Sequence, residues 1–195
     1  MDLKIKEFFD ECASRWDDME PEWTIAVINK ILDRIAPSSE DIILDAGCGT
    51  GVLLPFLKGR GVKRYTGLDC SDKMLQALRA KFPGAKTVAA DYQSPGLFPD
   101  ASFSKIIIYN AFPHFTAPPD VFDNSFRYLK RGGGLYIVHS MNRKTLDLHH
   151  KNAGIAVEDH VLESDESLRN HYQTAGFIRP ETDDGDYFYS CGFKP

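Results

Sequence analysis

A glycine-rich stretch follows the first apolar run that reads as a buried strand. From residue 43 to residue 51 the sequence is ILDAGCGTG, with glycine at positions 47, 49 and 51. Glycine directly after a strand lets the backbone turn sharply and approach a ligand closely. The pattern is typical of a loop that holds a nucleotide. Two ligands are open at this point, a dinucleotide such as NAD and S-adenosylmethionine.

Three aspartates favour S-adenosylmethionine over NAD. Asp45 lies inside the glycine stretch, and Asp69 and Asp91 end the next two predicted strands. A carboxylate beside a pyrophosphate is unfavourable, whereas it suits a cationic ammonium group. Asp69 can accept hydrogen bonds from ribose hydroxyls, and Asp91 from the adenine amine with Tyr92 against the ring. The spacing G-x-G-x-G also departs from the G-x-G-x-x-G of dinucleotide-binding proteins.

Histidines follow the strands on the other side of the predicted site. His114 comes after the fourth predicted strand, His139 ends the fifth, and His149 lies in the segment beyond. Three interpretations stay open. One histidine is a general base for a hydroxyl or thiol acceptor, or two or three of them bind a metal ion, or they are polar groups that line a cavity. His114 and His139 are the candidate catalytic residues, and all three are candidate metal ligands.

Further side chains are candidates for the acceptor pocket. Trp16 and Phe112 are the aromatic residues expected to form its wall or to contact a sulfonium by cation–π attraction. Arg143, after the fifth predicted strand, pairs with an anionic acceptor or is a solvated loop charge. His149 completes the predicted pocket.

The elements that must position these residues alternate between strands and helices. Strands are predicted at 42–44, 64–68, 85–89, 103–109, 135–140, 177–182 and 186–193, and helices at 6–20, 22–36, 52–59, 71–82, 121–129 and 167–175. The segment 143–163 is mixed and mostly polar. Alternation of this kind gives a parallel sheet with helices on both faces, and the last two strands, which lack a helix between them, pair antiparallel.

Composition narrows the class of protein. The chain has 195 residues, a formal net charge of −5 and four cysteines. The cysteines match no zinc-binding spacing, and no window has the apolar length of a membrane span. The acidic N-terminus is not typical of a secretory signal. We therefore expect a reduced, cytoplasmic protein without stable membrane insertion. The net negative charge makes nucleic acid a poor partner.

Several motifs together resemble those of the class I S-adenosylmethionine-dependent methyltransferases. They are LDAGCGTG, YTGLDCSDKML, AADYQ and FSKIIIYNAFPHF, in that order from about residue 41. The opening FFDECASRWDD is similar to the N-terminal helix of ubiquinone/menaquinone-type small-molecule methyltransferases. The resemblance implies an α/β fold: a Rossmann-like three-layer αβα sandwich with a seven-stranded, mostly parallel sheet, an antiparallel last strand and N-terminal helices. Residues 1–40 would form a helical cap, and residues 41–195 the S-adenosylmethionine-binding core.

The resemblance also implies roles for individual residues. The loop on the methionine side would comprise Asp45, Gly47, Cys48, Gly49 and Gly51. Asp69 would hold the ribose, Cys70 and Met74 would lie near the adenosine, Asp91 and Tyr92 would bracket the adenine, and Asn110 would lie near the methyl donor.

The predicted activity is methyl transfer to a small molecule. Amino-methylating DNA enzymes carry [N/D]-P-P-[Y/F] after the fourth strand, where this chain reads Asn110-Ala111-Phe112-Pro113. Because a sulfonium is already an activated donor, the acceptor needs few protein groups and leaves little trace in a sequence. The alternatives are an NAD-dependent oxidoreductase and a non-catalytic protein that binds S-adenosylmethionine or a metal. The acceptor and the oligomeric state stay open.

Overall fold

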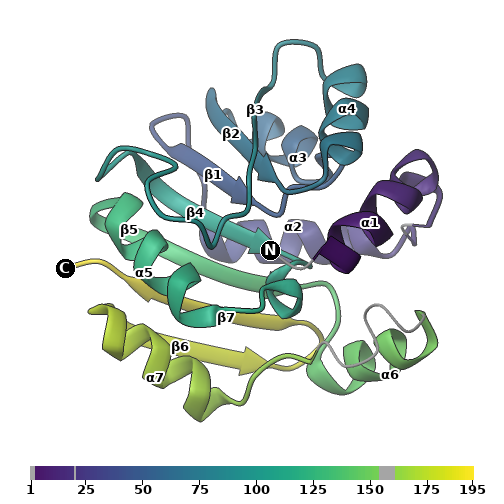
Figure 1. Ribbon diagram of the computed structural model, residues 1–195. Coiled ribbons are helices and arrows are strands. Elements are labelled where there is room, and N and C mark those ends of the chain that lie inside the picture. Colours follow the sequence, from purple (N-terminus) through teal and green to yellow (C-terminus); the bar gives the residue numbers. More distant parts are fainter. Residues whose placement is uncertain (1–2, 20, 154–160) are drawn as a thin grey trace.

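A seven-stranded sheet forms the centre of the protein (Figure 1). The computed structural model describes residues 3–19, 21–153 and 161–195, and the side chains of residues 149–153 are not part of that description. The strands are β1 (Ile42–Ala46), β2 (Arg64–Asp69), β3 (Lys86–Ala89), β4 (Phe103–Tyr109), β5 (Leu129–His139), β6 (Ile178–Asp184) and β7 (Phe188–Phe193), in the order β3-β2-β1-β4-β5-β7-β6.

Only β7 runs against the other strands of this sheet. The pairs β1–β2, β1–β4, β2–β3 and β4–β5 are parallel, whereas β7 pairs antiparallel with both β5 and β6. The predicted Rossmann-like sheet with a reversed last strand is therefore confirmed. Because the parallel strands point the same way, their carboxyl ends meet at one edge, where ligands of open α/β sheets bind.

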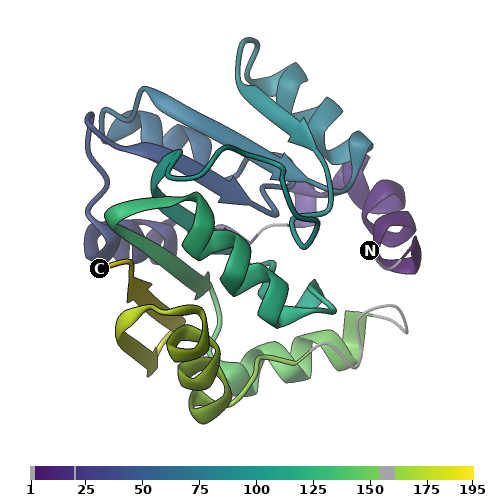
Figure 2. The ribbon, with the colours of Figure 1, turned by 60° about the vertical axis from the view of Figure 1, so that its left-hand side comes forward.

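Helices cover both faces of the sheet (Figures 1 and 2). The helices α2 (Thr24–Ile35), α3 (Leu54–Gly59) and α4 (Asp72–Lys81) cover one face, and α5 (Pro118–Tyr128) and α7 (Asp165–Ala175) the other. Ile31 of α2 and Leu57 of α3 are fully buried against Ile43, while Phe122 of α5 packs in the opposite cluster with Leu44. The alternation of Ile43 and Leu44 between the two clusters follows from the two-residue period of a strand.

Local sequence signals explain several element ends. Ser71 accepts a hydrogen bond from the Met74 amide and caps α4. Pro55 lies in the first turn of α3, where its missing N–H costs no helical bond. Gly176 ends α7 with a φ of 96°, which glycine adopts without steric cost.

The structure adds elements that the sequence patterns did not predict. The helix α6 (Arg143–Ala153) occupies part of the segment whose pattern is mixed, and it was not predicted because its sequence is mostly polar. The strand β5 begins at Leu129, before the RGGG run, and a register shift lies between Phe103 and Lys105 on β4. No helix of the described chain is long and apolar enough to cross a membrane.

The N-terminal segment divides into two parts with different neighbours. The helix α1 (Leu3–Cys12) and the 3₁₀ turns η1 (Ala13–Arg15) and η2 (Asp17–Met19) lie beyond the carboxyl ends of the strands (Figure 1). We call these residues, 3–19, the cap. The helix α2, by contrast, packs on the sheet itself. The predicted boundary at residue 40 stays a prediction.

Candidate functional site

A hollow lies where the carboxyl ends of β1, β2 and β4 meet the cap. It encloses about 870 Å³ of space, open solvent included. The glycine loop, the ends of β2 and β4, the segment after β3 and the cap all contribute to its walls. Among the described residues that line it there is neither lysine nor arginine, whereas Asp69 and Asp91 are both present. The walls therefore favour a ligand that carries positive charge and no phosphate.

The glycine loop forms the floor through its backbone. The amides of Gly47 and Cys48 donate to the Leu68 carbonyl at 2.8 and 3.0 Å, which ties the loop to β2. Gly47 has a φ of 78°, and a Cβ there would lie 2.5 Å from Cβ of Ala111. Gly49 has a φ of 50° with open space around its Cα. Because these residues have no side chain, the loop can lie closer to β4 and to a ligand than a larger residue would allow.

Asp69 is held against this loop at the end of β2. Its Oδ2 accepts from the Gly49 amide and its Oδ1 from the Ser71 amide, both at 2.8 Å. Burial raises the pKa of the Asp69 carboxyl, against the effect of these amides. A carboxylate has about four lone-pair sites, so Asp69 can still accept a hydrogen bond from a ligand hydroxyl.

The segment after β3 brings a second carboxylate to the wall. Asp91 Oδ1 accepts from the backbone and side-chain nitrogens of Gln93, each at 3.0 Å. Burial acts to raise the Asp91 pKa, but hydrogen bonds from groups that include Gln93 prevail, so the pKa lies below its usual value. Tyr92 is almost fully buried, with its hydroxyl 2.7 Å from Ser125 Oγ, and only its edge reaches the hollow. Cys70 lines the same wall, and burial raises its thiol pKa to about 12.

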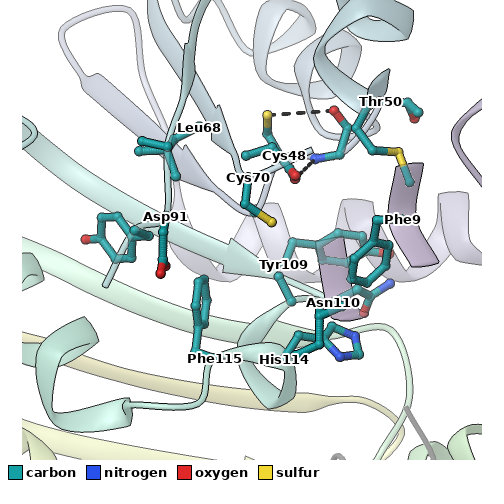
Figure 3. A pocket seen from close by; sticks show the side chains of 18 of the residues that line it. Phe9, Cys48, Thr50, Leu68, Cys70, Asp91, Tyr109, Asn110, His114 and Phe115 are labelled. Atoms are coloured by element: carbon teal, nitrogen blue, oxygen red, sulfur yellow. Dashed lines mark hydrogen bonds between the residues drawn. The ribbon is translucent and has the colours of Figure 1, made fainter. Parts of the chain in front are cut away.

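The cap and the turn after β4 supply an aromatic wall (Figure 3). The ring of Phe9 stands edge-on to Trp16 at 5.5 Å and to the His114 imidazole at 5.1 Å between centroids. His114 lies in η3 (Phe112–His114), and Phe115 follows it. These four residues all line the hollow. An aromatic surface with one imidazole can bind a ring and accept a proton from it.

Asn110 joins β4 to this turn. It has a φ of 51°, which is uncommon for a residue other than glycine. Its side chain is held by Ser140 after β5, because the Ser140 amide donates to Asn110 Oδ1 at 2.8 Å and Asn110 Nδ2 donates to Ser140 Oγ at 3.1 Å. Asn110 lines the hollow beside Tyr109 and His114 (Figure 3).

Two aspartates fasten the cap over the hollow. Ser71 Oγ donates to Asp10 Oδ1 at 2.5 Å, and Thr50 Oγ1 donates to Asp17 Oδ1 at 2.6 Å. Lys81 lies 2.7 Å from the other oxygen of Asp17. The cap therefore attaches to the glycine loop and to the N-terminus of α4, the same elements that form the floor.

Asp45 does not line the hollow. The residue is 2% exposed, beneath the glycine loop, where its carboxyl accepts the Tyr65 hydroxyl at 2.9 Å. Burial raises the Asp45 pKa to about 7, against the lowering effect of the Tyr65 hydrogen bond. The sequence placed a carboxylate beside the ligand, whereas the structure places this one behind the loop.

Other predicted site residues also lie elsewhere. Gly51 faces Leu78, so its small size serves the packing of the loop on α4 rather than a ligand. Phe112 is 2% exposed and stands edge-on to Phe122, so it is a core residue. Arg143 pairs with Asp165 at 2.6 Å and Asp184 at 3.3 Å and does not line the hollow, so its contact with an anionic acceptor stays a prediction.

The histidines do not form a metal centre in the described chain. His139 is 1% exposed on β5, with its ring 6.5 Å from that of Phe188, and it does not line the hollow as His114 does. The side chain of His149 lies outside the described residues. Among those that are described, no three His, Cys, Asp or Glu side chains group as metal ligands would. Of these two histidines, the structure places only His114 in the lining of the hollow.

Sequence patterns missed some of the wall. Ile5, Thr50 and Gln93 line the hollow, and nothing in their spacing distinguishes them from ordinary helix or loop residues. Phe9 is one of several aromatic residues near the N-terminus, and composition alone does not single it out. Its position one helical turn after Ile5, on the same face of α1, is the signal that could have selected it.

The comparisons with known proteins agree with this geometry. The family described as "Methyltransferase domain" matches residues 44–137. A ubiquinone biosynthesis O-methyltransferase of Paracidovorax citrulli is 29% identical over 138 residues, which cover 66% of this chain and 58% of the relative. A demethylmenaquinone methyltransferase of Thermotoga maritima is 28% identical and covers 70% of this chain and 62% of that protein. The chain thus spans about three fifths of these curated relatives.

A solved structure is similar over almost the whole chain. It is a complex between the Haloferax volcanii Trm112 methyltransferase activator and the putative methyltransferase. The TM-score is 0.83 at 23% identity, with 98% of this chain and 97% of that chain covered. At this identity the similarity establishes the fold.

The sheet order and the glycine loop define a nucleotide-binding α/β domain of the Rossmann-like type. Together with the family and relatives above, they support a class I S-adenosylmethionine-dependent methyltransferase. These matches give no support to an NAD-dependent oxidoreductase.

Proposed function

We propose that this protein transfers the methyl group of S-adenosylmethionine to an uncharged, ring-bearing small molecule. The observation that carries the proposal is the character of the hollow. Two carboxylates and a glycine loop without a described lysine or arginine face an aromatic wall that bears His114. The first wall suits a cationic, phosphate-free donor, and the second suits a planar acceptor with a removable proton.

The proposed roles follow from the positions of the side chains. The oxygens of Asp69 accept the ribose hydroxyls, Asp91 accepts the adenine amine, and Cys70 and Met74 contact the adenosine. The open backbone at Gly49 admits the methionine portion. S-adenosylmethionine, when bound, supplies an electrophilic methyl group on a sulfonium. The protein has to hold the acceptor in line with that methyl group and exclude water.

His114 is proposed as the base that removes the acceptor proton. Its imidazole stands against Phe9 and beside Asn110 at the aromatic wall (Figure 3). The aromatic rings of Phe9, Trp16 and Phe115 would hold the acceptor ring. His139 lies deeper, on β5 outside the lining, and we propose no catalytic role for it.

The proposal favours a small molecule over nucleic acid. The hollow lies under the cap, and the described walls offer no cation to a phosphate backbone. The Haloferax neighbour was solved with a Trm112 activator. RNA and protein substrates, with and without such an activator, therefore belong in the test. Location in the cytoplasm stays a prediction.

The test combines binding with turnover. S-adenosylhomocysteine should raise the melting temperature of the protein and NAD should not. In a radiolabelled methyl-transfer screen, phenols, quinols, thiols and aromatic amines should include an acceptor, and RNA and protein should not. His114→Gln should lower kcat about 100-fold or more while the affinity for S-adenosylhomocysteine changes little. His171→Gln, at a histidine that pairs with Glu163 outside the hollow, is the matched control. Stabilisation by NAD alone, or labelling of RNA alone, would overturn the proposal.

A further inference from the structure

A cluster of buried polar side chains lies directly beneath the glycine loop. Tyr65 on β2 donates its hydroxyl to the Asp45 carboxyl on β1, and the Sγ of Cys48 from the loop also lies in hydrogen-bond contact with that hydroxyl. Cys48 lines the hollow on its other side, so it separates the cluster from the ligand space. The cluster is thus one residue removed from the place where the donor is proposed to bind.

Gly67 makes room for this arrangement. It pairs with Asp45 in the β1–β2 register, and it lies on the same face of the sheet as Tyr65, two residues before it. A Cβ at position 67 would lie 2.8 Å from Cys48 Sγ and 2.9 Å from Tyr65 Oη. Only glycine at this position lets the tyrosine lie along the sheet and reach Asp45.

The described neighbours of Asp45 include no cation to balance its charge. The titratable groups that act on the carboxyl are Tyr65 and Asp69, of which the second is an acid. On β4, Ile107 pairs with Asp45, and Tyr109 lies two residues further along the same face. The helices α2 and α3 cover this face with apolar side chains such as Ile31 and Leu57.

At the donor site proposed above, the donor and its product differ by one charge. S-adenosylmethionine carries a sulfonium, whereas S-adenosylhomocysteine has a neutral thioether in its place. In a buried site a positive charge interacts strongly with a nearby carboxylate and hardly at all with a protonated carboxyl group. The ionisation state of Asp45 can therefore distinguish donor from product even though its side chain touches neither.

We propose that Tyr65 is a positioning residue for this discrimination, because its hydroxyl holds the Asp45 carboxyl in the ionised form that favours the cationic donor over the spent product. The inference rests on the donor site proposed above. In chemical terms, the cluster helps the protein release S-adenosylhomocysteine after each transfer. Product release limits many enzymes, so the preference matters for turnover.

The direction of the pH dependence follows from linkage. Burial raises the Asp45 pKa to about 7, so the carboxyl is largely protonated at pH 6 and largely ionised at pH 8. Affinity for S-adenosylmethionine should therefore rise across this interval relative to affinity for S-adenosylhomocysteine. Without the Tyr65 hydroxyl, the Asp45 carboxylate loses a hydrogen bond and its pKa rises further. The rise in preference for S-adenosylmethionine therefore moves to higher pH.

The experiment measures the dissociation constants of both ligands by calorimetry from pH 6 to pH 9. The quantity compared between proteins is the ratio of the two dissociation constants. Titration of the ligands' own amino groups affects this ratio equally for every variant, so it cancels in the comparison. In the wild-type protein, the preference for S-adenosylmethionine over S-adenosylhomocysteine should rise about fivefold from pH 6 to pH 8, measured relative to the change in Asp45→Asn. Tyr65→Phe should show the same gain only at higher pH.

Controls separate this inference from loss of structure and from the proposed function. Tyr172→Phe removes another fully buried tyrosine hydroxyl, which lies near Ser190, and should match the wild-type protein. Melting temperatures show whether each variant is folded. A Tyr65→Phe curve that superposes on the wild-type curve, or a ratio that Asp45→Asn leaves unchanged at every pH, would overturn the inference and leave the donor site intact. Failure of the wild-type protein to bind either ligand would instead overturn the proposed function.

Discussion

The attachment of the cap is open to a direct test at Asp17. This carboxylate accepts the Thr50 hydroxyl at 2.6 Å and lies 2.7 Å from Lys81, and it is the link between the η2 turn and the glycine loop. The substitution Asp17→Asn keeps the shape of the side chain and removes its charge. We expect the cap to bind the core less tightly, and a ligand beneath the cap to bind less tightly with it.

The size of the effect can be worked out from the two contacts. Thr50 is buried, and a hydrogen bond to a charged group contributes about 1.5–3 kcal/mol, of which an amide oxygen would retain about 1 kcal/mol. The pair with Lys81 adds little, because the two side chains are 33% and 51% exposed and the charges are screened. The net loss is about 1–2 kcal/mol, which corresponds to about 5-fold to 30-fold weaker ligand binding if cap closure and binding are fully coupled.

Calorimetry with S-adenosylhomocysteine would measure the weaker ligand binding, and hydrogen exchange of the cap amides would measure the looser attachment of the cap. Amide hydrogen exchange in residues 3–19 should be faster in Asp17→Asn than in the wild-type protein. Addition of S-adenosylhomocysteine should slow that exchange again. The control is Asp100→Asn, because that carboxylate pairs with Arg127 on the surface and not with the cap. Unchanged exchange together with ligand affinity within about twofold of the wild-type value would refute the role of this contact.

Two further predictions concern the folded state. Gly47→Ala should lower the free energy of unfolding by about 2–5 kcal/mol, since the residue has a φ of 78° and its Cβ would lie 2.5 Å from that of Ala111. Gly84→Ala, with a φ of 88° and open space, should cost only about 1–2 kcal/mol in the same urea titration, and equal losses would contradict the proposed clash. The pKa of Asp41 is lowered, because hydrogen bonds from Ser104 and Lys105 outweigh the raising effect of burial. Its contribution to the free energy of unfolding is therefore fully present above the ordinary aspartate pKa and is lost as the pH falls from that value through the lowered pKa of the folded state. Asp41→Asn should make the acid side of the stability curve flatter, and parallel curves would contradict the assignment.

Much of the fold could be predicted from short-range signals. The β-branched run of β4 and the Ser71 cap of α4 are local features, so their structure followed from the sequence. The helix α6 was not predicted because its sequence is mostly polar and contains few apolar residues. The extension of β5 through RGGG escaped as well, since glycine-rich strands are stabilised by their neighbours and not by their own preferences.

The candidate site divides in the same way. Strand-end residues such as Asp69, Asp91 and Asn110 line the hollow because the ends of parallel strands must meet, and a sequence of alternating elements already implies that meeting. Phe112 and Arg143 stand at equally suggestive positions, yet one is in the core and the other pairs with two surface carboxylates. Side-chain direction within a turn depends on packing partners that are distant in the sequence.

The sequence by itself determined the sheet, the glycine loop and the presence of carboxylates around it, because each follows from local patterns that recur at fixed spacing. Only the tertiary structure decided which of those carboxylates line the hollow. Asp45 reads as a ligand-binding residue in ILDAGCGTG, but Gly67, twenty-two positions later, opens the space into which Tyr65 reaches to bind it. The same holds for the cap, whose aromatic residues become a wall only because Asp10 and Asp17 fasten it to Ser71 and Thr50. Contacts between such distant residues depend on the packing of the whole fold, and no local pattern encodes them.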